Sequence, residues 1–135
     1  MKIVIIDGQG GRLGSLLAEG IKKSGIRAEV LAVGTNAVAT AAMIKAGADA
    51  GATGENPVLV ACRDADYILG PIGILAADAL LGEVTPAMAV AIGQSKAQKL
   101  LLPVSHCRNT VIGVKEQSMN ELVKEAVERL KTLDR

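Results

Sequence analysis

The chain has 135 residues and a formal net charge of +1, and half of its residues are apolar although Tyr67 is the only Phe, Tyr or Trp. The near-neutral charge, without a block of like charges, argues against a partner that is nucleic acid or a membrane surface. Cys62 and Cys107 are too few for a disulfide framework, and the apolar run near the start is too short for a signal peptide or a membrane span. We therefore expect a single cytoplasmic domain over residues 1–135.

The first third of the chain alternates predicted strands with predicted helices. Ile3–Ile6 is a continuous β-branched run, which is typical of a strand buried on both faces. Leucine and isoleucine then recur at helical spacing over residues 13–21. A second strand over residues 30–33 precedes a helix from Asn36, a suitable N-cap, to about Ala46. This alternation indicates a parallel sheet.

The middle of the chain is harder to assign. Residues 48–54 can hold a short third strand. Asn56 followed by Pro57 fits a helix cap with proline at the first helical position, but the apolar run over residues 58–60 can also be extended. The sequence therefore leaves Pro57–Arg63 open between helix and strand.

The second half contains elements of both kinds, and most of them have clear boundary signals. They are a strand at Tyr67–Leu69, a helix at Ile72–Leu81, a helix from Thr85-Pro86 to about Gln94, a strand at Leu100–Val104, an edge strand at Val111–Val114, and a last helix from Ser118 with a capping box to Glu121. Together these elements predict an α/β fold. We expect a three-layer Rossmann-like domain with a mostly parallel sheet of about five to six strands.

The strongest motif is the glycine loop, which we define as Gly8–Gly14 and which joins the first predicted strand to the first predicted helix. In this context a glycine pattern predicts phosphate binding by the helix N-terminus. Gly8 would allow the tight turn, Gly11 the close approach of a pyrophosphate, and Gly14 close packing of the helix on the strand. The alternative is that the loop only makes a turn. The predicted cofactor-binding residues here are Gly8, Gln9, Gly10, Gly11, Arg12, Leu13 and Gly14.

The spacing of the glycine loop is G-x-x-G-x-x-G, because position 13 is leucine. It resembles the variant found in extended short-chain reductases and in dihydrodipicolinate reductase, where an arginine also follows the second glycine, as Arg12 does here. This resemblance covers about the first third of the chain.

The cofactor preference depends on the end of the second strand, where dinucleotide-binding proteins place an acid against the adenosine ribose. Thr35 and Asn36 occupy this place and no carboxylate follows the strand, while Glu29 lies too early, inside it. Room for a 2′-phosphate favours NADP over NAD, and the pattern leaves FAD and nucleotide metabolites open. Gly70 and Pro71, after a later strand, complete the predicted nucleotide site.

Several phrases along the chain together resemble one small bacterial family, catalogued as domain of unknown function 3842. They are Ile5–Gly11, Ala46–Asp49, Gly51–Asn56, Cys62–Asp66, Gly70–Ile74 and Glu83–Ala89. The family has no established activity. The resemblance therefore implies a stand-alone Rossmann-like domain and transfers no catalytic residue.

The catalytic candidates are His106 and Cys107, in a polar segment directly after a predicted strand. Imidazole can act as an acid or base near neutral pH, and a thiolate can be a nucleophile. Adjacent side chains of an extended chain point to opposite sides, so these two are not expected to form a pair. A polar loop without chemistry is the alternative. Cys62 is expected to be a core thiol. Glu83 precedes a predicted helix start, where a carboxylate interacts favourably with the helix dipole. No cluster of residues has metal-ligand spacing, so no metal site is predicted.

Three functions remain open. The first is a dinucleotide-binding protein, with NADP favoured, whose catalytic status the sequence leaves open. The short chain favours a sensing or regulatory module, because nothing is left over for a substrate domain. The second is a small NAD(P)-dependent reductase with a site shared across a homodimer. The third is a structural or regulatory subunit in which the glycine loop is only a turn. The high apolar content with few aromatic residues also predicts a homo-oligomer.

Overall fold

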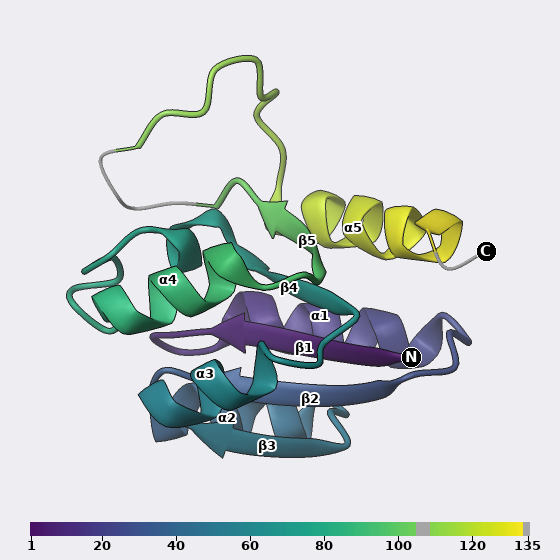
Figure 1. The fold of residues 1–135 in the computed structure, drawn as a ribbon. Helices are drawn as coiled ribbons and strands as arrows, with labels where there is room; N and C mark the ends of the chain where they lie inside the picture. Colours follow the sequence, from purple (N-terminus) through teal and green to yellow (C-terminus); the bar gives the residue numbers. More distant parts are fainter. Residues whose placement is uncertain (105–108, 134–135) are drawn as a thin grey trace.

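The described strands form one all-parallel sheet in the order β3-β2-β1-β4-β5 (Figure 1). The computed structural model describes residues 1–104 and 109–133. The strands are β1 (Lys2–Asp7), β2 (Glu29–Gly34), β3 (Ala50–Thr53), β4 (Tyr67–Pro71) and β5 (Gln98–Leu102). The chain runs outward from β1 to β3 and then crosses back to β4. The order therefore reverses between β1 and β4, and sheets of this kind bind ligands beyond the carboxyl ends of the strands near that point.

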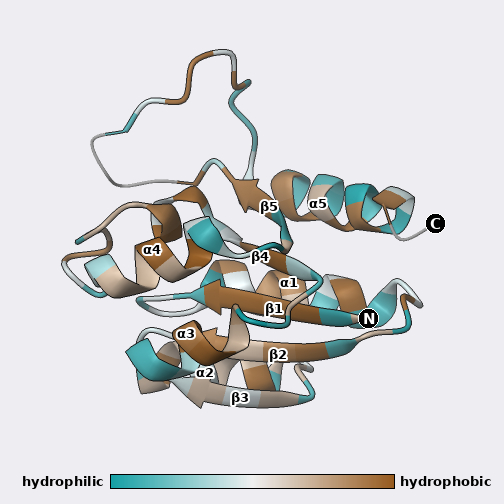
Figure 2. Ribbon diagram, viewed as in Figure 1, coloured by the Kyte–Doolittle hydropathy of each residue, from teal (hydrophilic) through white to brown (hydrophobic). Residues whose placement is uncertain are grey.

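Helices cover both faces of this sheet, which gives the three-layer Rossmann-like α/β fold that the sequence predicts. The described helices are α1 (Arg12–Lys23), α2 (Ala37–Lys45), α3 (Glu55–Ala61), α4 (Pro86–Gln94), α5 (Met119–Leu133) and the 3₁₀ helix η1 (Ile72–Leu75). One apolar core joins the sheet to α1, α2 and α5, and a second joins it to α3 and α4. Ile3 and Ile5 of β1 belong to the first core, whereas Val4 and Ile6 belong to the second. Figure 2 shows the resulting apolar central strands. None of the described helices is both long enough and apolar enough to cross a bilayer.

Three predicted helix starts are confirmed by their caps. The Asn36 carboxamide oxygen accepts a 2.9 Å hydrogen bond from the Ala39 N–H, and the Thr85 hydroxyl accepts one of 3.2 Å from the Met88 N–H. At α5 the Ser118 hydroxyl accepts from the Glu121 N–H at 3.2 Å, as in a capping box.

Residues 57–63, which the sequence leaves open, lie mostly in helix α3. The helix begins at Glu55, and Gly54 is its N-cap with a φ of 107° and no side-chain hydrogen bond. The predicted capping role of Asn56 is therefore wrong. Val58 and Ala61, three residues apart, are buried together in the second core, which explains why the segment is helical.

The helix predicted over Ile72–Leu81 is wrong beyond its first turn. Only η1 is helical, and the chain then turns through residues 76–84, which we call the β4–α4 loop. Asp78, Leu80 and Leu81 have φ values of 67°, 57° and 57°, a left-handed conformation that a right-handed helix cannot contain. Hydrogen bonds from the Asp78 N–H to the Val84 carbonyl and from the Val84 N–H to the Ala79 carbonyl close this loop, at 2.7 and 3.1 Å.

Two further predictions near the sheet edge differ from the structure. Strand β5 ends at Leu102 because Pro103 has no N–H to donate, so it lies two residues earlier than predicted. The predicted edge strand at Val111–Val114 is absent from the described residues. Ile112 is 89% exposed there, and the segment projects away from the sheet (Figure 1).

Candidate functional site

The glycine loop lies at the carboxyl end of β1 and leads directly into α1. Gly11 is the N-cap of α1 in a left-handed conformation, with a φ of 72°. Its N–H donates to the Gly8 carbonyl at 2.9 Å, and the Ser15 hydroxyl donates to the Gly11 carbonyl at 2.7 Å. These bonds close the turn and place the start of α1 at the carboxyl end of β1, where the strand order of the sheet reverses.

The buried carboxyl group of Asp7 holds both ends of the glycine loop. Asp7 is 6% exposed, and its two oxygens accept hydrogen bonds from the Gly8 and Gly14 N–H groups at 2.8 and 2.7 Å. Burial raises the pKa of Asp7 above its usual range, although these two hydrogen bonds oppose the shift. Asp7 thus satisfies one of the orphan N–H groups of the first turn of α1.

Three further N–H groups of the loop have no partner among the described residues. Among the hydrogen bonds of the described residues, none uses the N–H of Gly10, Arg12 or Leu13. Gly10 and Arg12 are exposed residues, and both lie at the positive end of the α1 dipole.

The glycines of the loop are needed for different steric reasons, as the space around each Cβ position shows. A Cβ on Gly14 would collide with the Met43 sulfur and lie 3.0 Å from the Asp7 Cβ, which confirms close packing at this position. A Cβ on Gly11 would lie 2.8 Å from the Ala39 Cα, so this glycine makes room for the backbone of α2. The predicted reason, the approach of a pyrophosphate, is therefore not needed to explain Gly11. Gly10 has no atom within 4 Å of its Cβ position.

A carboxylate from the β4–α4 loop reaches the end of β2. Glu83 Oε1 accepts hydrogen bonds from the Thr35 hydroxyl at 2.6 Å, the Asn36 amide nitrogen at 2.7 Å and the Gln9 N–H at 2.9 Å. Burial raises the pKa of Glu83, but these three hydrogen bonds outweigh it, so the pKa lies below its usual value. The predicted absence of a carboxylate beside Thr35 and Asn36 is therefore wrong, and with it the reason for preferring NADP.

The side chains around Glu83 also explain why Gly8 is a glycine. A Cβ on Gly8 would lie 2.5 Å from the Thr35 hydroxyl, 2.8 Å from Leu80 Cδ1 and 3.0 Å from Glu83 Oε1. The glycine loop, the end of β2 and the β4–α4 loop therefore meet at one point. Sequence reasoning placed Glu83 near a helix start and missed this role.

Two further predicted residues, Gly70 and Pro71, are buried beside the end of β1. Gly70 and Pro71 are the last residues of β4, buried and paired with Leu101 and Leu102 of β5. A Cβ on Gly70 would collide with the Ile6 carbonyl oxygen, so this glycine allows close pairing with β1. The catalytic candidates His106 and Cys107 lie outside the described residues.

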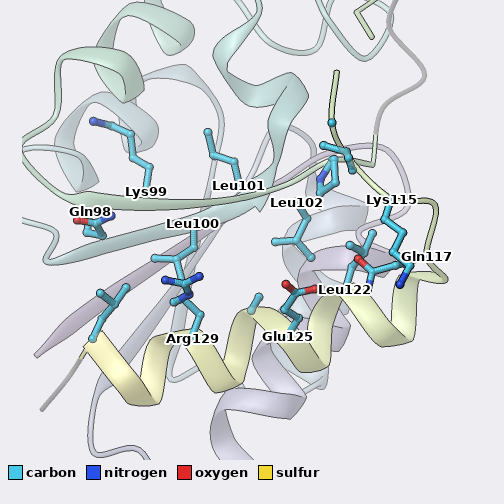
Figure 3. Close-up of a pocket in the computed structure, with 15 residues that line it drawn as sticks. Gln98, Lys99, Leu100, Leu101, Leu102, Lys115, Gln117, Leu122, Glu125 and Arg129 are labelled. Carbon is cyan, nitrogen blue, oxygen red and sulfur yellow. The ribbon is translucent and has the colours of Figure 1, made fainter. Parts of the chain in front are cut away.

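A groove of about 710 Å³ runs along the outer edge of β5 beside α5 (Figure 3). Leu100 and Leu102 point toward α5, and Glu125 and Arg129 of that helix face them. A second groove, of about 620 Å³, lies between α3 and α4 and includes Cys62. Neither groove is lined by the glycine loop.

Two other kinds of site are relevant to the described residues, a reactive thiol and a metal site. Desolvation raises the pKa of the Cys62 thiol to about 11, despite the opposing charge of Lys99, so this cysteine is protonated and unreactive near neutral pH. No group of three metal-ligating side chains gathers within residues 1–104 and 109–133. The clearest assembly of polar groups is the junction of the glycine loop with Thr35, Asn36 and Glu83.

Comparison with known proteins supports the family predicted from the sequence. The model of a family described as Domain of unknown function (DUF3842) matches residues 2–135. No curated protein matches the chain. Among solved structures, a dodecameric FMN-dependent UbiX-like decarboxylase from Escherichia coli O157:H7 is similar, with 15% identity and a TM-score of 0.45, over 100% of this chain and 96% of that chain. At that TM-score the similarity supports no inference about ligand, activity or assembly.

Proposed function

This chain belongs to the family described as Domain of unknown function (DUF3842), and we propose from its geometry that it is a nucleotide-binding protein whose glycine loop holds a phosphate of the ligand. The observation that carries this proposal is the exposed start of α1, where the N–H groups of Gly10 and Arg12 have no partner among the described residues. Helix starts of this kind attract phosphate through unpaired N–H groups and the helix dipole.

The charge next to this helix start supports the same ligand. Arg12 is exposed and makes no ion pair with any described residue. A guanidinium beside unpaired N–H groups is a favourable place for a phosphate, because Arg forms charge-assisted and often bidentate hydrogen bonds with it. The arrangement therefore provides both directed donors and a compensating charge.

The proposal concerns binding and names no reaction. The predicted catalytic residues, His106 and Cys107, lie outside the described residues. At the glycine loop, the Asp7 carboxyl accepts two N–H groups and Glu83 accepts three donors, so both side chains serve to hold the loop in shape.

The proposal is tested by titration calorimetry with ADP, NAD⁺, NADP⁺ and FMN, all of which carry phosphate. We expect at least one of them to bind, and we expect Gly10→Asp to weaken that binding at least about tenfold, or 1.4 kcal/mol, by repelling the phosphate. Gly10 has space for a side chain, so the fold should be unaffected. The matched control is Asn120→Asp, which adds the same charge at an exposed residue of α5 beside the far end of α1, near Gly20 and Ser24. No heat with any of the four ligands, or equal affinity for wild type and Gly10→Asp, would overturn the proposal.

A further inference from the structure

We infer that the Glu83 carboxylate recognises the ribose of the ligand by accepting hydrogen bonds from its hydroxyls. The protein would then select nucleotides with a free 2′-hydroxyl and reject those with a 2′-phosphate. This inference rests on the proposed nucleotide binding and adds to it a specificity-determining residue and a substrate class. The usual acid of such sites lies in the chain directly after the second strand. Here the residues at that place are Thr35 and Asn36, and a carboxylate from a distant segment joins them.

The position of Glu83 fits a ribose because it bridges the two segments that a nucleotide bridges. With its phosphate on the glycine loop, a nucleotide in this fold places its adenosine ribose at the carboxyl end of the second strand. Glu83 Oε1 contacts the glycine loop through the Gln9 N–H, 2.9 Å away, and the end of β2 through the Thr35 hydroxyl, 2.6 Å away. A ligand extending from Arg12 toward Thr35 would therefore pass this carboxylate.

The carboxylate is held in place and still has acceptor capacity. All three described donors bind the same oxygen, Oε1, and no donor in the described part of the chain contacts Oε2. An ionised carboxylate accepts about four hydrogen bonds through its two oxygens. Oε2 can therefore accept from ribose hydroxyls while Oε1 keeps the side chain oriented. Glu83 is half-buried, so part of this residue is exposed to solvent.

Charge determines which nucleotides this arrangement rejects. A phosphate on the 2′ position would add negative charge beside a carboxylate whose hydrogen bonds favour the ionised form. A hydroxyl at the same position instead donates to the carboxylate, a charge-assisted bond. No lysine or arginine of the described residues forms an ion pair with Glu83 that would compensate a 2′-phosphate.

A different role for Glu83 predicts a different result. If its carboxylate stood in for the ligand's own phosphate at the Gln9 N–H, it would compete with every nucleotide and with inorganic pyrophosphate. The contacts favour the ribose, because Gln9 is the one residue of the glycine loop that donates to Glu83 among the described hydrogen bonds. The N–H groups of Gly10 and Arg12 are left for the phosphate. The test separates the two roles.

Titration calorimetry on the wild-type chain compares NAD⁺ with NADP⁺ and ADP with 2′-deoxy-ADP. We expect NAD⁺ to bind at least about tenfold more tightly than NADP⁺, and ADP several times more tightly than its deoxy form. Glu83→Gln retains an oxygen for the three donors but loses the charge. This variant should reduce the NAD⁺ to NADP⁺ ratio to about threefold or less. Glu29→Gln, at the opposite end of β2, should keep the wild-type ratio.

The other outcomes overturn the inference, and they distinguish its failure from the failure of nucleotide binding. Equal wild-type affinity for NAD⁺ and NADP⁺, or an unchanged ratio in Glu83→Gln, would exclude ribose reading while nucleotide binding stands. Tighter binding of all nucleotides and of pyrophosphate by Glu83→Gln would make the carboxylate an internal competitor. No binding of any nucleotide would overturn the proposed function and this inference together. The comparison of ADP with 2′-deoxy-ADP needs no variant, and equal affinity for the two would exclude recognition of the 2′-hydroxyl even if Glu83→Gln does not fold.

Discussion

At the scale of single residues, two carboxylates at the glycine loop are shifted in opposite directions. Asp7 is buried, so its pKa is raised, and its contribution to stability is greatest below its ordinary pKa of 3.8 and is lost as the pH rises through the raised value. The pKa of Glu83 is lowered, so its contribution is present above 4.5 and is lost as the pH falls through the lowered value. At neutral pH Glu83 therefore stabilises the junction of the two loops, whereas the raised pKa of Asp7 works against stability as the pH rises.

Cys62 provides a test of burial in the second core. Two pKa units separate the ordinary thiol, at 9.0, from the value of about 11 in the fold. At pH 8 the thiolate fraction is therefore about 100-fold smaller than that of an exposed cysteine. We expect Cys62, in a Cys107→Ser background, to react with Ellman's reagent at least about 100-fold more slowly than free cysteine. A rate that approaches that of free cysteine in the folded chain would contradict the buried position.

At the scale of elements, local signals were sufficient for most helices and strands and insufficient for the site. The caps at Asn36 and Thr85 are contacts across three residues, so the sequence alone reveals them. Glu83, in contrast, lies 47 residues from Asn36 and 74 from Gln9, and only the crossover from β4 brings them together. No periodicity or spacing in the chain records such a contact.

The predicted helix over residues 72–81 was wrong for a related reason. Its composition is apolar and has no proline after Pro71, so nothing local ends the helix. The left-handed residues of the β4–α4 loop end it, together with the burial of Ile74 and Ala79 in the second core. Tertiary packing thus overrides the local preference there. The glycine pattern was sufficient to locate the glycine loop, but it did not show that Gly11 accommodates α2.

Gly10 and Gly11 form a matched pair for testing that last point. Gly11→Ala would place a Cβ 2.8 Å from the Ala39 backbone at a φ of 72°, so we expect a loss of about 3 kcal/mol and a melting temperature lower by about 10 °C. Gly10→Ala meets no atom within 4 Å and should change stability by less than about 0.5 kcal/mol. Thermal unfolding followed by circular dichroism measures both. Equal melting temperatures for the two variants would contradict the close approach of α1 and α2.

At the scale of the whole molecule, the described surface includes apolar helix residues without a partner. Helix α4 is apolar on nearly all sides, from Pro86 to Gly93, although only one side packs on the sheet (Figure 2). Val90 on its outer side is 54% exposed and lines the groove between α3 and α4. A helix that is apolar all round is normally buried, and such surfaces are typical of contacts between subunits.

We therefore expect the chain to self-associate through the outer side of α4. Light scattering coupled to gel filtration at tens of micromolar should give at least twice the chain mass of 13.8 kDa. Val90→Glu should restore the monomer mass, because burying an unpaired carboxylate in the interface costs several kcal/mol. Val38→Glu makes the same change on α2, where Val38 is 68% exposed on the other side of the sheet, and it should leave the assembly intact. A monomeric wild type would exclude self-association. Dissociation by Val38→Glu alone would move the interface to α2, because only a carboxylate that association buries can weaken the contact between subunits.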